Sequence, residues 1–346
     1  MKYTTLPNTN IKVSKICLGT MTWGKQNTQD EGFLQMDYAL DSGVNFFDTA
    51  ELYPVPAEAE TYAETERIIG NWFKKTGHRD KVVLASKIAG PGDYTAHIRK
   101  TGYSKSALKE AVENSLKRLQ TDYLDLYQLH WPERETNYFG PRDYKHNPND
   151  AWEDNFKEVL ETLNGFIKEG KIRQIGISNE KSWGMMRYLN ESKTNNLPRI
   201  STIQNPYSLL NRTFEGDLAE FSIRENVGLL AYSPLASGSL SGKYIGGKTP
   251  KNSRFDLFPR FSGRYDSPQA LKATEDYFKI AEAHGLSLAQ MSLAFINQQP
   301  FITSNIIGAT NLDQLKENIE SIKVTLSEAI IEEINQVHNT YPNPAP

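Results

Sequence analysis

The sequence has few of the features that mark secreted or membrane-spanning proteins. Its 346 residues include one cysteine, Cys17, so no intramolecular disulfide can form. No run approaches the roughly 18 consecutive apolar residues of a spanning helix, and residues 1–5 lack the apolar core of a secretory signal. These absences predict a cytoplasmic protein without a membrane partner. Cys17 lies in an apolar run and is expected to be a buried hydrophobic residue.

The chain also has no large excess of charge of either sign. The chain has 39 basic and 42 acidic residues, a formal net charge of −3, and no basic stripe. Because nucleic-acid binding needs such a stripe, we expect no nucleic-acid partner. The six histidines and one cysteine show no metal-ligand spacing, so we also expect no metal site. The G-x-G-x-x-G fingerprint of doubly wound dinucleotide-binding sheets does not follow Ile16–Gly19, the first apolar, β-rich run. This absence disfavours a doubly wound open sheet.

Short apolar, β-rich runs alternate with longer segments of helical spacing. Eight runs read as strands: Ile16–Gly19, Asn45–Asp48, Val82–Ala85, Tyr123–Leu129, Ile172–Ile177, Ile200–Gln204, Leu229–Tyr232 and Asn305–Gly308. The clearest helical segments are Phe33–Leu40, Ser106–Leu119, Trp152–Lys168, Pro268–Ala283, Leu288–Gln298 and Leu312–Ile322. Such alternation indicates parallel strands joined by crossover helices. Eight units predict an α/β fold, the closed (β/α)8 TIM barrel.

We expect residues 1–346 to form a single domain around this barrel. Tyr3–Val13 is predicted to form a short N-terminal hairpin that plugs the bottom of the barrel. Long loops, Glu133–Asp150 and Ala236–Ser267, follow the fourth and seventh strands, at the face where barrel enzymes place their active sites. The proline-rich tail, residues 341–346, is expected to lie extended on the surface.

Four polar residues fall at that face. Asp48 ends the second strand, Tyr53 lies in the loop that follows, Lys87 ends the third strand and His130 ends the fourth. Tyrosine has an ordinary pKa near 10, and an adjacent ammonium would lower it while a carboxylate holds the ammonium in place. His130 could donate a hydrogen bond to a carbonyl oxygen that gains charge. The set favours protonation of an oxyanion as a hydride arrives, and no activated nucleophile supports hydrolysis.

The sequence resembles the aldo-keto reductase family over nearly its whole length. Long motifs in chain order carry the resemblance: Leu18–Gly24, Gly43–Tyr53, Ala85–Lys87, Ser115–Leu119 and Asp122–Pro132. Glu51–Pro56 and Gln204–Arg212 look most like the bacterial Tas-type reductases, with the potassium-channel β subunits as more distant relatives.

The resemblance implies roles for particular residues. The family's catalytic tetrad corresponds to Asp48, Tyr53, Lys87 and His130. Its cofactor-binding positions correspond to Gly19, Thr20, Ser178, Asn179, Gln204, Tyr232, Ser233, Pro234, Leu235, Ser237, Gly238, Lys243, Gly308, Thr310, Gln314, Glu317 and Asn318. Within this set Ser178, Asn179 and Gln204 would contact the carboxamide, Tyr232 would stack on the nicotinamide ring, and Lys243 would lie near the pyrophosphate.

Structural alternatives stay open for several of these positions. Asn179 and Gln204 could pair with neighbouring strand ends, Tyr232 could be core filler and Lys243 a solvated loop charge. Trp23 and Trp131 are interpreted as walls of the substrate pocket, with core packing as the alternative.

One position departs from the family pattern. Gln314 stands where many members have an arginine that grips the 2′-phosphate of NADP, and an amide cannot replace that bidentate contact. Arg260, Arg264 or Lys243 could supply the charge instead. We expect NADPH as the cofactor, with NADH as the alternative.

The expected activity is reversible, NADPH-dependent reduction of a small-molecule aldehyde or ketone, with Tyr53 as the proton donor. The alternative is a redox-sensing subunit that holds the cofactor, turns over slowly and has a stable protein partner, like the channel β subunits.

Overall fold

The computed structural model describes residues 1–346 and is built from ten strands and eleven α-helices. The strands are β1 (Tyr3–Thr5), β2 (Lys12–Ser14), β3 (Ile16–Gly19), β4 (Phe46–Asp48), β5 (Val83–Ile88), β6 (Leu124–Leu129), β7 (Ile172–Ser178), β8 (Ile200–Pro206), β9 (Gly228–Tyr232) and β10 (Ile302–Ile307). The helices are α1 (Gln29–Asp41), α2 (Glu64–Thr76), α3 (Lys105–Leu119), α4 (Phe156–Lys168), α5 (Ser182–Asn195), α6 (Leu218–Glu225), α7 (Arg254–Leu257), α8 (Pro268–Ala283), α9 (Leu288–Asn297), α10 (Leu312–Glu320) and α11 (Glu328–Thr340).

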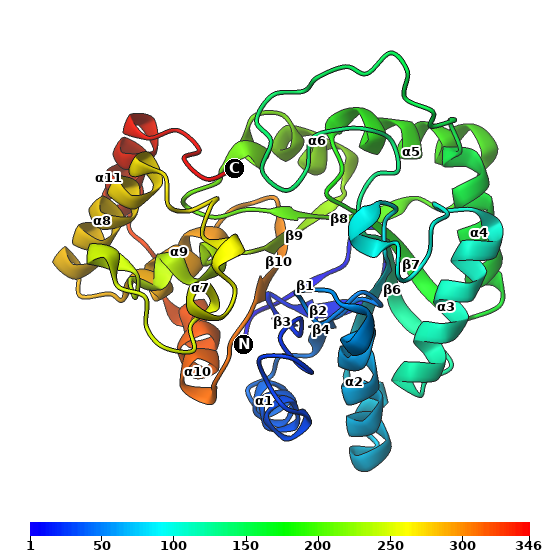
Figure 1. The fold of residues 1–346 in the computed structure, drawn as a ribbon, viewed down its shortest axis with the longest axis horizontal. Helices are drawn as coiled ribbons and strands as arrows, with labels where there is room; N and C mark the ends of the chain where they lie inside the picture. The colour runs from blue at the N-terminus through cyan, green and yellow to red at the C-terminus, as the bar shows by residue number, and fades with distance from the viewer.

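Strands β3 to β10 form a closed parallel barrel in the order β10-β3-β4-β5-β6-β7-β8-β9. Neighbours in the barrel follow chain order, and the last strand closes the barrel by pairing with the first. Figure 1 shows the helices arranged around these strands. The predicted (β/α)8 TIM barrel is therefore confirmed. No helix combines the length and the apolar character needed to cross a membrane.

Side-chain caps set several helix starts. Thr28 accepts a hydrogen bond from the Glu31 N–H, and the Glu31 carboxylate accepts one from the Thr28 N–H at 2.8 Å, which makes a capping box for α1. Ser104 caps α3 by accepting from the Ala107 N–H at 3.3 Å. The helix predicted to begin at Ser106 therefore begins at Lys105, with Ser106 inside its first turn.

Two of the element boundaries that differ from the prediction have an identifiable cause. The helix expected from Trp152 begins at Phe156, because the Asp154 side chain accepts the Phe156 N–H at 3.3 Å and stabilises a turn there. The strand expected from Asn305 begins at Ile302. Its first residues include the polar Thr303 and Ser304, so the apolar pattern does not show where the buried strand starts.

The N-terminal hairpin is confirmed as an antiparallel pair, β1 with β2. Leu6 and Val13 are fully buried and pack against inward-facing barrel residues that include Cys17 and Phe46. The hairpin therefore closes one end of the barrel, opposite the carboxyl ends of its strands. Burial raises the pKa of the Cys17 thiol well above its ordinary value, so Cys17 is a packed hydrophobic residue.

The C-terminal tail is anchored, and its expected extended course on the surface was wrong. Ala345 is buried, and its N–H donates to the Leu210 carbonyl at 3.0 Å. The Pro344 carbonyl accepts a hydrogen bond from Arg142 Nη2 at 3.2 Å. The tail therefore ties the loop after β6, residues 130–155, to the mouth of the barrel, which explains why Pro346 lines the cavity described below.

Candidate active site

A buried ion pair lies at the carboxyl ends of β4 and β5. Lys87 Nζ donates to Asp48 Oδ2 at 2.6 Å and to the Thr49 carbonyl at 2.8 Å. Asp48 Oδ1 accepts from Gln204 Nε2 at 2.9 Å and from Gln128 Nε2 at 3.2 Å. Buried charges are tolerated only when they are paired and hydrogen-bonded, and here both conditions hold. The barrel thus fixes an ammonium beneath its mouth.

Tyr53 and His130 lie directly beside this pair. The Tyr53 ring centroid is 5.0 Å from Lys87 Nζ, and the Tyr53 and His130 rings meet edge to face with centroids 5.8 Å apart. The His130 ring makes no hydrogen bond within the protein, and its Nδ1 is buried without a partner. The structure therefore brings together Asp48, Tyr53, Lys87 and His130, the four residues selected from the sequence.

The environment keeps both rings uncharged at neutral pH. Burial raises the pKa of Tyr53 well above its ordinary value, and the Asp48 charge raises it further. Burial, with a contribution from the Lys87 charge, lowers the pKa of His130 well below its ordinary value. The expected net lowering of the Tyr53 pKa by Lys87 was wrong, because burial of the phenol and the charge of Asp48 outweigh the ammonium. Tyr53 is therefore a protonated phenol and His130 a neutral imidazole.

These directions predict a flat pH profile. The ordinary pKa values are about 6.5 for histidine and about 10 for tyrosine. Since the His130 pKa is lowered and the Tyr53 pKa is raised, neither group should titrate between about pH 6.5 and pH 9. We expect kcat/KM for a carbonyl compound, which reports the free enzyme, to change less than about threefold over this range. A limb with an apparent pKa near 8 would show instead that Lys87 acidifies the phenol.

A second polar group continues along the barrel mouth from β7 to β9. Asn179 Nδ2 donates to the His130 carbonyl at 2.9 Å, and the Tyr232 hydroxyl donates to Asn179 Oδ1 at 2.6 Å. The Ser178 hydroxyl donates to the Gln204 carbonyl at 2.7 Å. These side chains pair with neighbouring strand ends, as the structural alternative proposed, and they also line the central cavity.

One large cavity covers this face of the barrel. Its volume is about 1680 Å³, which exceeds the 300–1,000 Å³ that is typical of a small-molecule pocket. Asp48, Tyr53 and His130 line it, and Lys87 lies buried beneath its floor. The lining also includes Gly19, Thr20, Ser178, Asn179, Gln204, Tyr232, Ser233, Pro234, Leu235, Ser237, Gly238, Lys243, Arg260, Gly308, Thr310, Gln314, Glu317 and Asn318. Every barrel strand, or the loop that follows it, therefore contributes to this cavity.

The segment after β9 approaches the cavity with an unusual backbone. Ser233 and Ser237 have positive φ angles of 53° and 55°, a conformation that is typical of backbone concavities that bind anions. A Cβ on Gly238, where φ is 96°, would lie 2.9 Å from Lys243 Nζ. Glycine therefore lets the Lys243 ammonium lie against this segment, which concentrates positive charge there.

The far end of the cavity is formed by the loop after β10 and the start of α10. Gln314 Oε1 accepts from the Thr310 N–H at 3.0 Å and from its hydroxyl at 3.1 Å. Asn318 Nδ2 donates to the Gly308 carbonyl at 3.1 Å. Glu317 accepts from Ser287 Oγ. Gln314 thus shapes the loop, and any charge that binds a phosphate there must come from elsewhere.

Four arginines bring positive charge to the lining of the cavity. Arg142, Arg254, Arg260 and Arg264 line the cavity, and none of them forms an ion pair with a carboxylate. Every other arginine in the chain does form one. The chain as a whole carries a net charge of −3, so this local excess of cations is specific to the cavity and favours an anionic ligand.

Sequence reasoning missed two of these arginines, Arg142 and Arg254. Arg254 is half-buried at the start of α7, and Arg254 Nη2 lies 3.4 Å from Gln26 Oε1. Both arginines lie in long loops whose paths no local pattern predicts. The sequence gives only an indirect sign that these arginines lack a carboxylate partner. Neither has an acidic residue three or four positions away on a regular helix, where an ion pair would form.

Trp131 forms part of an aromatic wall. Its Nε1 donates to the Pro91 carbonyl at 3.0 Å, and its ring stacks with Tyr138 at a centroid distance of 6.4 Å. A Cβ on Gly90 would lie 2.2 Å from Trp131 Nε1, so glycine is needed for this contact. Trp131 lines the cavity, and its role as a wall of the substrate pocket stays a prediction.

Trp23 lies in the core, and its expected placement in a pocket wall was wrong. Its side chain is fully buried, and its Nε1 donates to Gln35 Oε1 at 3.1 Å. A Cβ on Gly32 would lie 3.2 Å from the Trp23 ring, so the ring packs closely against α1. The chain after β3 turns this indole away from the cavity.

The chain matches a known protein family over nearly its whole length. The model of the family described as "Aldo/keto reductase family" matches residues 15–339. The chain therefore belongs to the aldo/keto reductase family, which identifies it as an oxidoreductase.

The chain is also similar to several proteins of known name. The chain is 49% identical to "Protein tas" of Escherichia coli (strain K12), over the full length of both. It is 33% identical to "Uncharacterized oxidoreductase YrpG" of Bacillus subtilis, over 99% of this chain and 97% of that protein. It is 29% identical to the "Probable voltage-gated potassium channel subunit beta" of Oryza sativa, over 99% of this chain and 98% of that protein.

Proposed function

We propose that the protein catalyses the reversible reduction of aldehydes and ketones to alcohols with NADPH, and that Tyr53 is the general acid. The observation that carries this proposal is the meeting of a phenol, an ammonium–carboxylate pair and a neutral imidazole on one side of a single cavity. A general acid must be protonated before the reaction, and the raised pKa of Tyr53, caused by burial, meets that requirement.

Two observations indicate that the cavity fits a phosphorylated dinucleotide. Its volume of about 1680 Å³ has room for such a cofactor and a substrate together. Its arginines are the ones without carboxylate partners. NADPH would lie with its carboxamide near Ser178, Asn179 and Gln204, and its pyrophosphate near Lys243. When bound, the nicotinamide supplies the hydride.

Tyr53 and His130 would divide the work at the carbonyl oxygen. The His130 ring, which has no hydrogen-bond partner in the protein, donates to the oxygen and orients it. As negative charge develops there, Tyr53 transfers its phenolic proton to the same oxygen. The Lys87 ammonium, 5.0 Å from the ring, then stabilises the phenolate. Asp48 holds Lys87 in place through the 2.6 Å ion pair.

The preference for NADPH over NADH can be tested at Arg254, which we propose to lie near the 2′-phosphate. Arg254 contacts Gln26, and the next residue, Asn27, donates to the Thr310 carbonyl at the far end of the cavity. We expect Arg254→Met to weaken NADPH binding about tenfold or more, since a charge-assisted hydrogen bond contributes about 1.5–3 kcal/mol. NADH, which lacks the 2′-phosphate, should lose less than about threefold. The measurement is titration of the intrinsic tryptophan fluorescence with each cofactor.

Arg224→Met is the matched control for this titration. Arg224 is exposed on α6 and pairs with Glu220, so its loss should leave both affinities unchanged. Equal losses for NADPH and NADH in Arg254→Met would contradict a role for Arg254 at the 2′-phosphate.

A second candidate function is a cofactor-binding subunit that senses redox state. Identities of 29% and 28% to proteins named as probable potassium channel β subunits favour it. NADPH oxidation with a panel of aldehydes and ketones separates the two functions. We expect turnover with at least one class of carbonyl. Tight NADPH binding without turnover on any of them would favour the subunit.

A further inference from the structure

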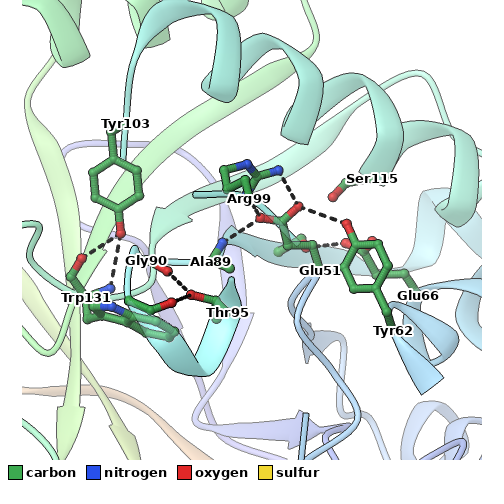
Figure 2. A network of polar contacts seen from close by, with 12 residues as sticks. Glu51, Tyr62, Glu66, Ala89, Gly90, Thr95, Arg99, Tyr103, Ser115 and Trp131 are labelled. Atoms are coloured by element: carbon green, nitrogen blue, oxygen red, sulfur yellow. Dashed lines mark hydrogen bonds and ion pairs between the residues drawn. The ribbon is translucent and has the colours of Figure 1, made fainter. Parts of the chain in front are cut away.

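Glu51 is a buried carboxylate two residues before Tyr53, and the proposed chemistry does not use it. Its side chain is fully buried. Glu51 Oε2 accepts from Arg99 Nη2 at 3.0 Å, and Arg99 Nη1 contacts Glu51 Oε1. Glu51 Oε1 also accepts the Ala89 N–H at 2.6 Å. Figure 2 shows Arg99 and Ala89 converging on this carboxylate.

Glu51 connects the loop that carries Tyr53 to β5, the strand that carries Lys87. Its own N–H donates to the Lys87 carbonyl at 3.2 Å, and its carboxylate accepts the N–H of Ala89, two residues further along. Regular pairing of β4 with β5 ends before this point, at Asp48. Glu51 therefore extends the contact between these two segments beyond the end of the strand pairing, to within two residues of Tyr53.

Arg99 connects Glu51 to the segment that contacts Trp131, on the His130 side of the cavity. Arg99 is buried in the segment between β5 and α3. In that segment the Tyr103 hydroxyl donates to the Trp131 carbonyl at 2.6 Å, next to His130 (Figure 2). The Glu51–Arg99 pair thus joins the Tyr53 loop to a segment that is fixed beside His130.

Stability alone does not explain such a pair. Taking two charges out of water costs about as much as their attraction returns, and replacement of a buried ion pair by apolar residues is often neutral or stabilising. Positioning is a stronger reason, because a misplacement of about 1 Å at a reacting centre can cost about 100-fold in rate.

We propose that the Glu51–Arg99 ion pair is a positioning device that fixes Tyr53 relative to Lys87 and His130. The proposal rests on the proposed function of Tyr53. Glu51 and Arg99 act through the loops that they hold, because neither residue lines the cavity.

Glu51→Gln tests the proposal. The neutral amide that replaces the carboxylate can still accept the Ala89 N–H but cannot form an ion pair with Arg99. The Tyr53 loop therefore loses its charged link to the segment beside His130. We expect kcat to fall about 10- to 100-fold, while KM for NADPH and its dissociation constant stay within about twofold. Arg99→Met should behave in the same way. Arg99→Lys keeps the positive charge and should recover most of kcat.

Asp125→Asn is the matched control. Asp125 is a buried carboxylate that pairs with Arg79 at 2.9 Å and accepts the N–H of Leu84, which lies on β5 as Lys87 does but near the opposite end of the strand. We expect it to lower Tm by about as much as Glu51→Gln and to leave kcat within about twofold of wild type.

Equal losses of kcat in Glu51→Gln and Asp125→Asn, or no loss in Glu51→Gln, would overturn the proposal. If Glu51→Gln does not fold, Glu51→Met combined with Arg99→Met removes both charges and should fold while it keeps the loss of kcat. A full recovery of kcat in that double variant would equally overturn it. Failure of the proposed function is separate, since it would appear as full activity in Tyr53→Phe.

Discussion

Tyr53→Phe is expected to lower kcat about 100- to 10,000-fold, the range of a lost general acid. The substitution removes one hydroxyl oxygen from a buried ring, and the ring contacts with His130 and Lys87 remain. The variant should therefore fold and bind NADPH with nearly unchanged affinity. Steady-state rates with an aldehyde and fluorescence titration with NADPH measure the two properties independently.

Tyr127→Phe is the control for this prediction. Tyr127 lies on β6, is fully buried, and its hydroxyl has no hydrogen-bond partner. Tyr127→Phe removes one buried hydroxyl oxygen, as Tyr53→Phe does, and should leave kcat unchanged. A Tyr53→Phe variant that turns over as fast as Tyr127→Phe would refute the role of Tyr53.

Lys87→Met should lower both activity and stability. Lys87 is fully buried and forms the 2.6 Å ion pair with Asp48. Its removal leaves an uncompensated buried carboxylate, which costs about 3–5 kcal/mol in the free energy of unfolding. The Tyr53 phenolate also loses its stabilising charge, so kcat should fall at least about 100-fold. Urea unfolding and steady-state kinetics measure the two effects.

The double variant Asp48→Asn/Lys87→Met separates the two effects. It removes both charges, so most of the lost unfolding free energy should return. Activity should stay low, because no ammonium remains beside Tyr53. Recovery of activity together with stability would mean that the ion pair serves the fold alone.

The barrel and the meeting of the four polar residues could be predicted from the sequence for one topological reason. Parallel strands place all their carboxyl ends on one face. Asp48, Lys87 and His130 each come at or next to such an end, so identifying the strands was enough to predict that they converge. Tyr53 followed because only a short loop separates it from Asp48.

Features that depend on the path of a loop could not be predicted in this way. Trp23 follows a barrel strand as His130 does, but the turn after β3 directs it into the core, where Gln35 accepts its N–H. Arg142 and Arg254 reach the cavity from loops with no regular periodicity. The tail is held by contacts with residues far away in the sequence, such as Leu210.

The direction of the Tyr53 pKa shift also needed the structure. The sequence placed an amine near the phenol, which favours the phenolate. It did not show how deeply the phenol is buried, and burial is the largest cause of the raised pKa, followed by the charge of Asp48.

In the proposed reaction, a hydride from bound NADPH and a proton from Tyr53 reach the same carbonyl group. The most direct measurement uses NADPH that is deuterated at the position of hydride transfer, with a panel of aldehydes and ketones and detection of the alcohols by mass spectrometry. We expect deuterium on the former carbonyl carbon with the wild-type protein, and almost none with Tyr53→Phe. An unlabelled alcohol, or an equal yield of labelled alcohol from both proteins, would contradict the account.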